Sequence, residues 1–117
     1  MFTKSIGDGE WEGKLINVGL CSGRHDIAGV TDFIFTEPIE NPNDFKALRE
    51  IASEKLDLMW NHGNCINLYV TGLSQALTIV LSEAFKLHES TKCDILFQVF
   101  HWDRESETYK GHTFAGN

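Results

Sequence analysis

Short apolar runs and two longer amphipathic stretches alternate along this chain. The short runs are rich in Val, Ile, Leu, Phe and Tyr and are bounded by Gly, Pro, Asn and Asp, a pattern typical of β-strands. A charged segment, residues 103–107, separates the last two of them and predicts a hairpin turn. The predicted strands cover residues 14–20, 31–37, 65–70, 92–102 and 108–114.

The two longer stretches repeat their apolar residues every three or four positions, which predicts amphipathic helices. The first follows Asn43, which can cap a helix, and ends near Gly63, which suits a left-handed residue after a helix. The second extends from Leu73 to His88. The predicted order is β-β-α-β-α-β-β, an α/β fold with a mixed sheet in two or three layers, and residues 65–102 should form a right-handed parallel crossover.

Length and composition predict one compact globular domain over residues 1–117. The apolar fraction of 42% is ordinary, and no apolar stretch approaches the roughly 20 residues of a membrane helix. The three cysteines are widely spaced, as in proteins with buried free thiols. We therefore expect a soluble cytoplasmic protein with no membrane partner, metal or cofactor.

The net charge of −7 argues against binding to a nucleic acid polymer, because such proteins neutralise phosphates with clustered Lys and Arg. A small anionic ligand remains possible, since two or three well-placed donors suffice to bind it.

Three segments are candidate ligand sites. The first is V-T-G-L-S-Q, where a strand becomes a helix: Thr71 and Ser74 carry hydroxyls, and Gly72 permits close approach to a helix N-terminus, which favours anions. The alternative is a capped helix after an ordinary turn.

The second candidate is the loop G-L-C-S-G-R-H-D, which gathers Ser22, Arg24, His25 and Asp26 after the first strand. A guanidinium suits phosphate, because it binds two oxygens at once. The alternative is a solvated turn in which Asp26 pairs with Arg24.

The third candidate is the C-terminal hairpin F-H-W-D-R-E-S-E-T-Y. Trp102 and Tyr109 can stack on a base, and Arg104 can reach a phosphate. The alternative is a charged hairpin tip that binds nothing.

Catalysis has weaker support, and we assign no catalytic residue. His25 could act with Cys21 or Ser22, and His101 with Asp103, but no nucleophile elbow or paired-carboxylate motif is present. We expect a binding protein more than an enzyme.

The element I-N-L-Y-V-T-G-L-S-Q-A-L-T resembles the strand–Thr-Gly–helix element of CRISPR-associated Rossmann-fold sensor domains, which bind cyclic oligoadenylates. Together with N-V-G-L-C-S-G-R-H and the terminal hairpin, it makes the chain look like a Thoeris anti-defence sponge. Those are phage proteins that bind cyclic ADP-ribose-type and cyclic nucleotide signals without cleaving them, and a phage-encoded protein would act in the host cytoplasm. The resemblance implies a homo-oligomer with ligand sites between subunits, contacted by Arg24, Trp102 and Arg104.

The function we expect is capture of a small cyclic nucleotide-type second messenger, which would counteract a signalling-based antiviral defence. One alternative is a metal-independent ring nuclease or phosphodiesterase that uses His25 or His101. Another is a protein–protein inhibitor whose acidic surface mimics nucleic acid.

Overall fold

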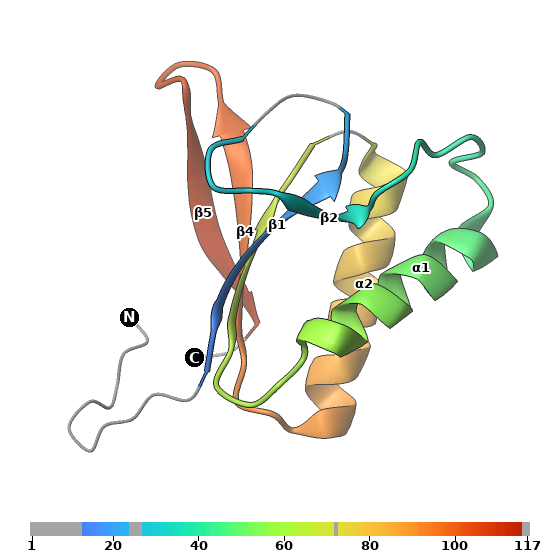
Figure 1. The fold of residues 1–117 in the computed structure, drawn as a ribbon, viewed down its shortest axis with the longest axis vertical. Coiled ribbons are helices and arrows are strands. Elements are labelled where there is room, and N and C mark those ends of the chain that lie inside the picture. The colour runs from blue at the N-terminus through green and yellow to red at the C-terminus, as the bar shows by residue number, and fades with distance from the viewer. Residues whose placement is uncertain (1–12, 24–26, 72, 116–117) are drawn as a thin grey trace.

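The computed structural model describes residues 13–23, 27–71 and 73–115. One five-stranded sheet packs against two helices, and both helices lie on the same side of the sheet (Figure 1). The α/β class and the predicted order of elements are confirmed, and the fold has two layers. The elements are β1 (Leu15–Cys21), β2 (Asp32–Phe35), α1 (Phe45–Met59), β3 (Cys65–Tyr69), α2 (Ser74–Thr91), β4 (Leu96–Asp103) and β5 (Thr108–Ala115).

The strand order is β2-β1-β3-β4-β5. The first four strands are parallel and β5 is antiparallel to β4, so the predicted mixed sheet and the parallel β3–α2–β4 crossover are confirmed. Helices α1 and α2 both connect strands in one direction along the sheet, and right-handed connections then place both on one face. The connection from β1 to β2 runs in the opposite direction, and the same rule places it on the other face.

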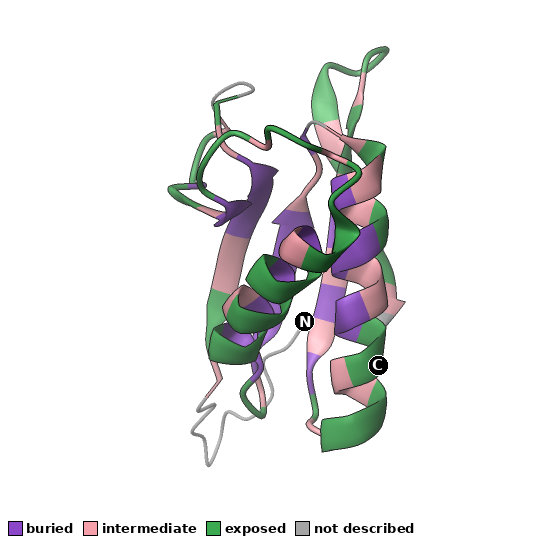
Figure 2. Ribbon diagram, turned by 90° about the vertical axis from the view of Figure 1, so that its right-hand side faces the viewer, coloured by how far each residue is buried: buried purple, intermediate pink, exposed green. Residues whose placement is uncertain are grey.

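The core lies between the sheet and the helices. Alternate residues of the central strands point toward the helices and are fully buried, among them Val18, Leu68 and Phe97. Leu56 and Val80 meet them from α1 and α2. Figure 2 shows that buried positions line the inner sides of both helices and the sheet. The other side chains of each strand point to the face without helices, called here the open face.

The helix ends differ from the prediction in detail. Asp44 caps α1 in place of Asn43, because the backbone N–H of Asn43 donates to the side chain of Asn41 at 3.0 Å, so the chain is still turning there. The Asp44 carboxylate accepts from the N–H of Ala47 at 3.3 Å. Helix α2 continues to Thr91 and ends with left-handed Lys92 (φ 57°), so the predicted strand start at residue 92 is wrong and β4 begins four residues later.

None of the helices in the described part of the chain is long and apolar enough to cross a membrane.

Candidate functional site

Four aromatic side chains gather on the open face, where β3 and β4 end. They are Tyr69 at the end of β3, Phe100 and Trp102 on β4, and Tyr109 on β5. The strand register brings them together, because Tyr69 is opposite Phe100, and Trp102 is opposite Tyr109. Side chains two residues apart on a strand share a face, so Phe100 and Trp102 project on the same side.

The four rings form one continuous cluster. Tyr69 stacks on Phe100 with ring centroids 4.9 Å apart, and its ring also meets the edge of Tyr109 at 5.2 Å. Tyr109 in turn contacts Trp102 at 5.3 Å with an interplanar angle of 68°. Trp102 is 48% exposed, a large fraction for an indole, so part of its surface is open to a ligand.

A glycine makes room for this cluster on the last strand. Gly111 lies opposite Phe100, and a Cβ at that position would be only 2.5 Å from the Phe100 ring. The absence of a side chain on Gly111 therefore lets the Phe100 ring lie flat against β5.

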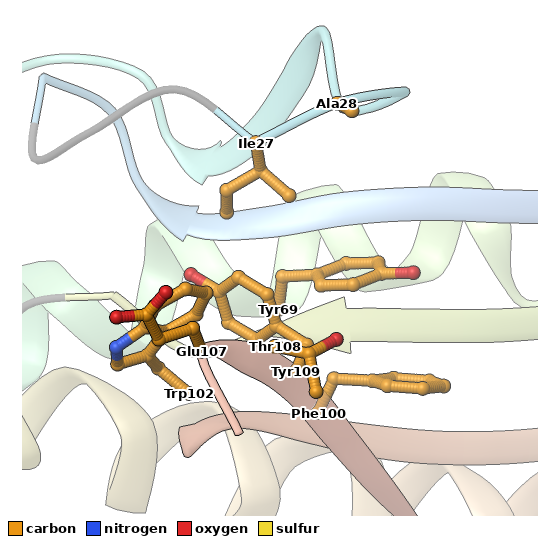
Figure 3. Close-up of a pocket in the computed structure, with 8 residues that line it drawn as sticks. All are labelled: Ile27, Ala28, Tyr69, Phe100, Trp102, Glu107, Thr108 and Tyr109. Atoms are coloured by element: carbon orange, nitrogen blue, oxygen red, sulfur yellow. The ribbon is translucent and has the colours of Figure 1, made fainter. Parts of the chain in front are cut away.

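The cluster forms the floor of a hollow of about 670 Å³. Ile27 and Ala28, on the connection from β1 to β2, form the opposite wall, and Ile27 points toward the aromatic rings (Figure 3). Glu107, the last residue of the β4–β5 turn, and Thr108, the first residue of β5, complete the lining. The volume is in the range of small-molecule sites, roughly 300–1,000 Å³, and the mainly apolar lining is typical of them.

The position of the hollow in the fold is also typical of a ligand site. In open α/β sheets, ligands bind beyond the carboxyl ends of the strands, at the point where connections leave in opposite directions. Here the connection after β1 crosses the open face and α2 follows β3 on the other face. Ile27 follows β1, Tyr69 ends β3, and Trp102 is near the end of β4, so the hollow lies at this switch point.

Thr71, one of the predicted site residues, lies beside this point but is buried. Its hydroxyl donates to the carbonyl of Cys21 at 2.8 Å and accepts from the N–H of Cys21 at 3.2 Å. The side chain thus links the end of β1 to the segment after β3, and both functions of the hydroxyl are used inside the fold.

The remaining predicted residues are distributed over several places. The Ser22 hydroxyl donates to the carbonyl of Thr36 at 2.9 Å. Ser74 is exposed on the first turn of α2, where it lines a separate hollow with Phe45 and other side chains of the helix layer. Arg104 is exposed on the β4–β5 turn. Arg24, His25 and Gly72 lie outside the described residues.

Of the predicted site residues that the structure describes, Trp102 and Tyr109 line the hollow. Burial, with a smaller contribution from nearby Tyr69, raises the pKa of the Tyr109 phenol. The sequence pattern did not single out the other two aromatic residues, Tyr69 and Phe100. The two-residue spacing of Phe100 and Trp102 was visible in the sequence, but only the register brings Tyr69 to them.

His101 and Asp103, the residues of one catalytic alternative, project from the helix-side face of the sheet, away from the hollow. The His101 ring lies parallel to that of His112, with centroids 5.5 Å apart. The Asp103 carboxylate accepts from the Ser106 hydroxyl at 2.6 Å and pairs with Lys110 at 3.4 Å. The hydrogen bond from the Ser106 hydroxyl is the main cause that lowers the pKa of Asp103.

Within residues 13–23, 27–71 and 73–115, no group of three or more His, Cys, Asp or Glu side chains is placed to hold a metal ion.

Comparison with known proteins gives no relative: no family model matches the chain, and searches of curated proteins and of solved structures find no similar protein.

Proposed function

We propose that this protein binds a small cyclic nucleotide-type second messenger and sequesters it, with the base of the ligand held in the aromatic hollow. The observation that carries the proposal is the cluster of Tyr69, Phe100, Trp102 and Tyr109 beside the switch point of the sheet. The sequence resemblance to anti-defence sponges supplies the ligand class and the biological role, which is to counteract a signalling-based antiviral defence.

Base stacking explains why an acidic protein could bind a nucleotide. Stacking of one base on aromatic side chains contributes about 1–3 kcal/mol and does not require a basic surface. Arg104, on the turn that joins β4 to β5, is the described arginine nearest in sequence to the hollow, and we propose that it pairs with a phosphate.

The lining of the hollow supports capture in preference to cleavage. The described lining residues include no histidine, cysteine or lysine, and the polar groups are the phenols, the Trp102 indole, Thr108 and Glu107. Metal-independent phosphodiester cleavage needs a general base and an acid within hydrogen-bonding reach of the reacting atoms. The described histidines nearest in sequence to the residues of the hollow are His101 and His112, and both project from the helix-side face of the sheet.

A homo-oligomer is part of the proposal. Strand β5 is the last strand of the sheet, and its eight residues offer an outer edge to which a second copy could add a strand. Size-exclusion chromatography with light scattering, with and without ligand, measures the oligomeric state directly.

The test of the proposed function is a thermal-shift screen against cyclic ADP-ribose isomers, cyclic di- and trinucleotides and cyclic oligoadenylates. A ligand present at about 100 times its Kd stabilises a fold by roughly 2.7 kcal/mol, a shift of several degrees for a domain of this size. The shift should disappear in Trp102→Ala and persist in Phe85→Ala, which removes an aromatic side chain of similar exposure on α2.

Chromatography of the ligand after heat denaturation of the protein then separates capture from catalysis. Intact ligand supports sequestration, and a cleaved product establishes the nuclease alternative. A panel that gives no shift at any concentration refutes nucleotide capture and directs attention to a protein partner of the acidic surface.

A further inference from the structure

We infer that the ring bound in the aromatic hollow carries a positive charge, and that Glu107 selects it. The inference rests on the proposed function of the hollow as a ring-binding site and adds a property of the ligand, its charge. The chemical class is a planar cationic heterocycle, such as a pyridinium or an N-alkylated purine.

The charge of the lining supports a cation. Glu107 is the one charged side chain among the described residues that line the hollow. The face of an aromatic ring is electronegative, so the exposed Trp102 indole attracts a cation placed over it. An aromatic cluster with a carboxylate at its margin therefore stabilises a positively charged ring more than a neutral ring of the same shape.

The Glu107 carboxylate has no hydrogen bond or ion pair with any residue that the structure describes. Lys110, on β5, pairs instead with Asp103 at 3.4 Å on the other face of the sheet. The turn itself is held by Asp103, which accepts from the N–H and the hydroxyl of Ser106. The fold therefore does not use the charge of Glu107, and the charge remains available to a ligand.

The backbone conformation of Glu107 is a second, independent reason to assign this residue a role in ligand binding. Its φ of 55° is in the left-handed region, which hairpin turns usually fill with Gly or Asn. A residue with a side chain is unfavourable there, and such exceptions occur preferentially at functional sites. In this turn the left-handed residue directs its carboxylate to the Trp102 end of the hollow (Figure 3).

The experiment compares two rings that differ in charge, nicotinamide and its permanently cationic form 1-methylnicotinamide. Affinities are measured by NMR titration on the wild-type protein, on Glu107→Gln, and on Glu105→Gln, a matched control that removes a charge from the same turn. We expect the wild type and Glu105→Gln to bind the cation at least about tenfold more tightly than the neutral ring. In Glu107→Gln the preference for the cation over the neutral ring should fall several-fold.

The outcomes separate this inference from the proposed function. Equal affinities for the two rings, or a preference that survives in Glu107→Gln, would overturn the cationic selection and leave ring binding intact. Failure of both rings to bind the wild-type protein would overturn ring binding, and the inference with it. The circular dichroism spectrum and Tm of Glu107→Gln, compared with those of Glu105→Gln, show whether the variant is folded.

Discussion

Replacement of Thr71 by valine isolates the link between the ends of β1 and β3. Valine has nearly the same shape as threonine but cannot form hydrogen bonds, and Thr71 is only 4% exposed. The substitution therefore removes the two hydrogen bonds to the backbone of Cys21, at 2.8 and 3.2 Å, and introduces little steric change.

The expected cost follows from these two hydrogen bonds. Each contributes about 1 kcal/mol net, and the loss is larger when a buried partner cannot reach water. We expect Thr71→Val to lower the free energy of unfolding by about 2–3 kcal/mol. For a chain of 117 residues this corresponds to a fall in Tm of roughly 8–12 °C, at about 4 °C per kcal/mol.

Urea denaturation followed by circular dichroism measures the effect, and Thr71→Ser is the control because it retains the hydroxyl. We expect the serine variant to lose about 1 kcal/mol, the value of one buried methyl group. If Thr71→Val were as stable as the wild type within 0.5 kcal/mol, or less harmful than Thr71→Ser, the structural account of this hydroxyl would be wrong.

Three further predictions concern the hairpin and the glycine beneath the cluster. Glu107→Gly should raise the free energy of unfolding by up to about 1 kcal/mol, since glycine accepts a positive φ, while it removes the preference for a cationic ring; destabilisation would contradict the strain argument. Ser106→Ala should raise the pKa of Asp103, measured by NMR. Because that pKa is lowered in the folded state, its stabilising effect is complete above the unfolded-state pKa and is lost as pH falls through the folded-state pKa. The loss should therefore be smaller in the variant and complete at a higher pH; an unchanged titration would refute the assigned cause. Gly111→Ala should destabilise the fold by about 1–3 kcal/mol in urea denaturation and shift the Phe100 ring signals, because its Cβ would be 2.5 Å from that ring; a neutral effect would show that the ring moves freely.

The pattern of apolar residues predicted the elements of this fold well because each helix and strand buries one periodic face. It could not give the strand order, which depends on contacts between distant segments. The helix ends were less predictable, since they depend on local hydrogen bonds. Asn41 competes for the N–H of Asn43, and α2 continues past its expected end at His88 to Thr91, where left-handed Lys92 ends it.

The candidate site was only partly visible in the sequence. Trp102 and Tyr109 stood out because they flank a charged turn, and both line the hollow. Tyr69 looked like the end of an ordinary central strand, and only its pairing with Phe100 reveals the larger cluster. Thr71 is the opposite case, a residue that the sequence suggested and the structure does not place in the hollow. Its hydroxyl, just before a helix, suggested a donor to a ligand, but in the structure it donates to the carbonyl of Cys21.

The connection from β1 to β2 explains why the hollow lies on the open face of the sheet. In a sheet of order β2-β1-β3-β4-β5, this connection must cross the face opposite α1 and α2, and here it brings Ile27 over the aromatic rings. None of the described helices covers this face, so the aromatic side chains of β3, β4 and β5 remain accessible at its carboxyl end.

The central claim, that the base of a nucleotide-type ligand lies on the aromatic cluster, is tested most directly at the indole of Trp102. The chain has three tryptophans, so a ¹⁵N-labelled sample gives few indole signals, and Trp102→Phe assigns the one of interest. On titration with cyclic ADP-ribose and, separately, with cyclic triadenylate, we predict that at least one ligand shifts the Trp102 indole signal while buried Trp60 stays unchanged. An unmoved Trp102 signal at millimolar concentrations of both ligands would contradict the account.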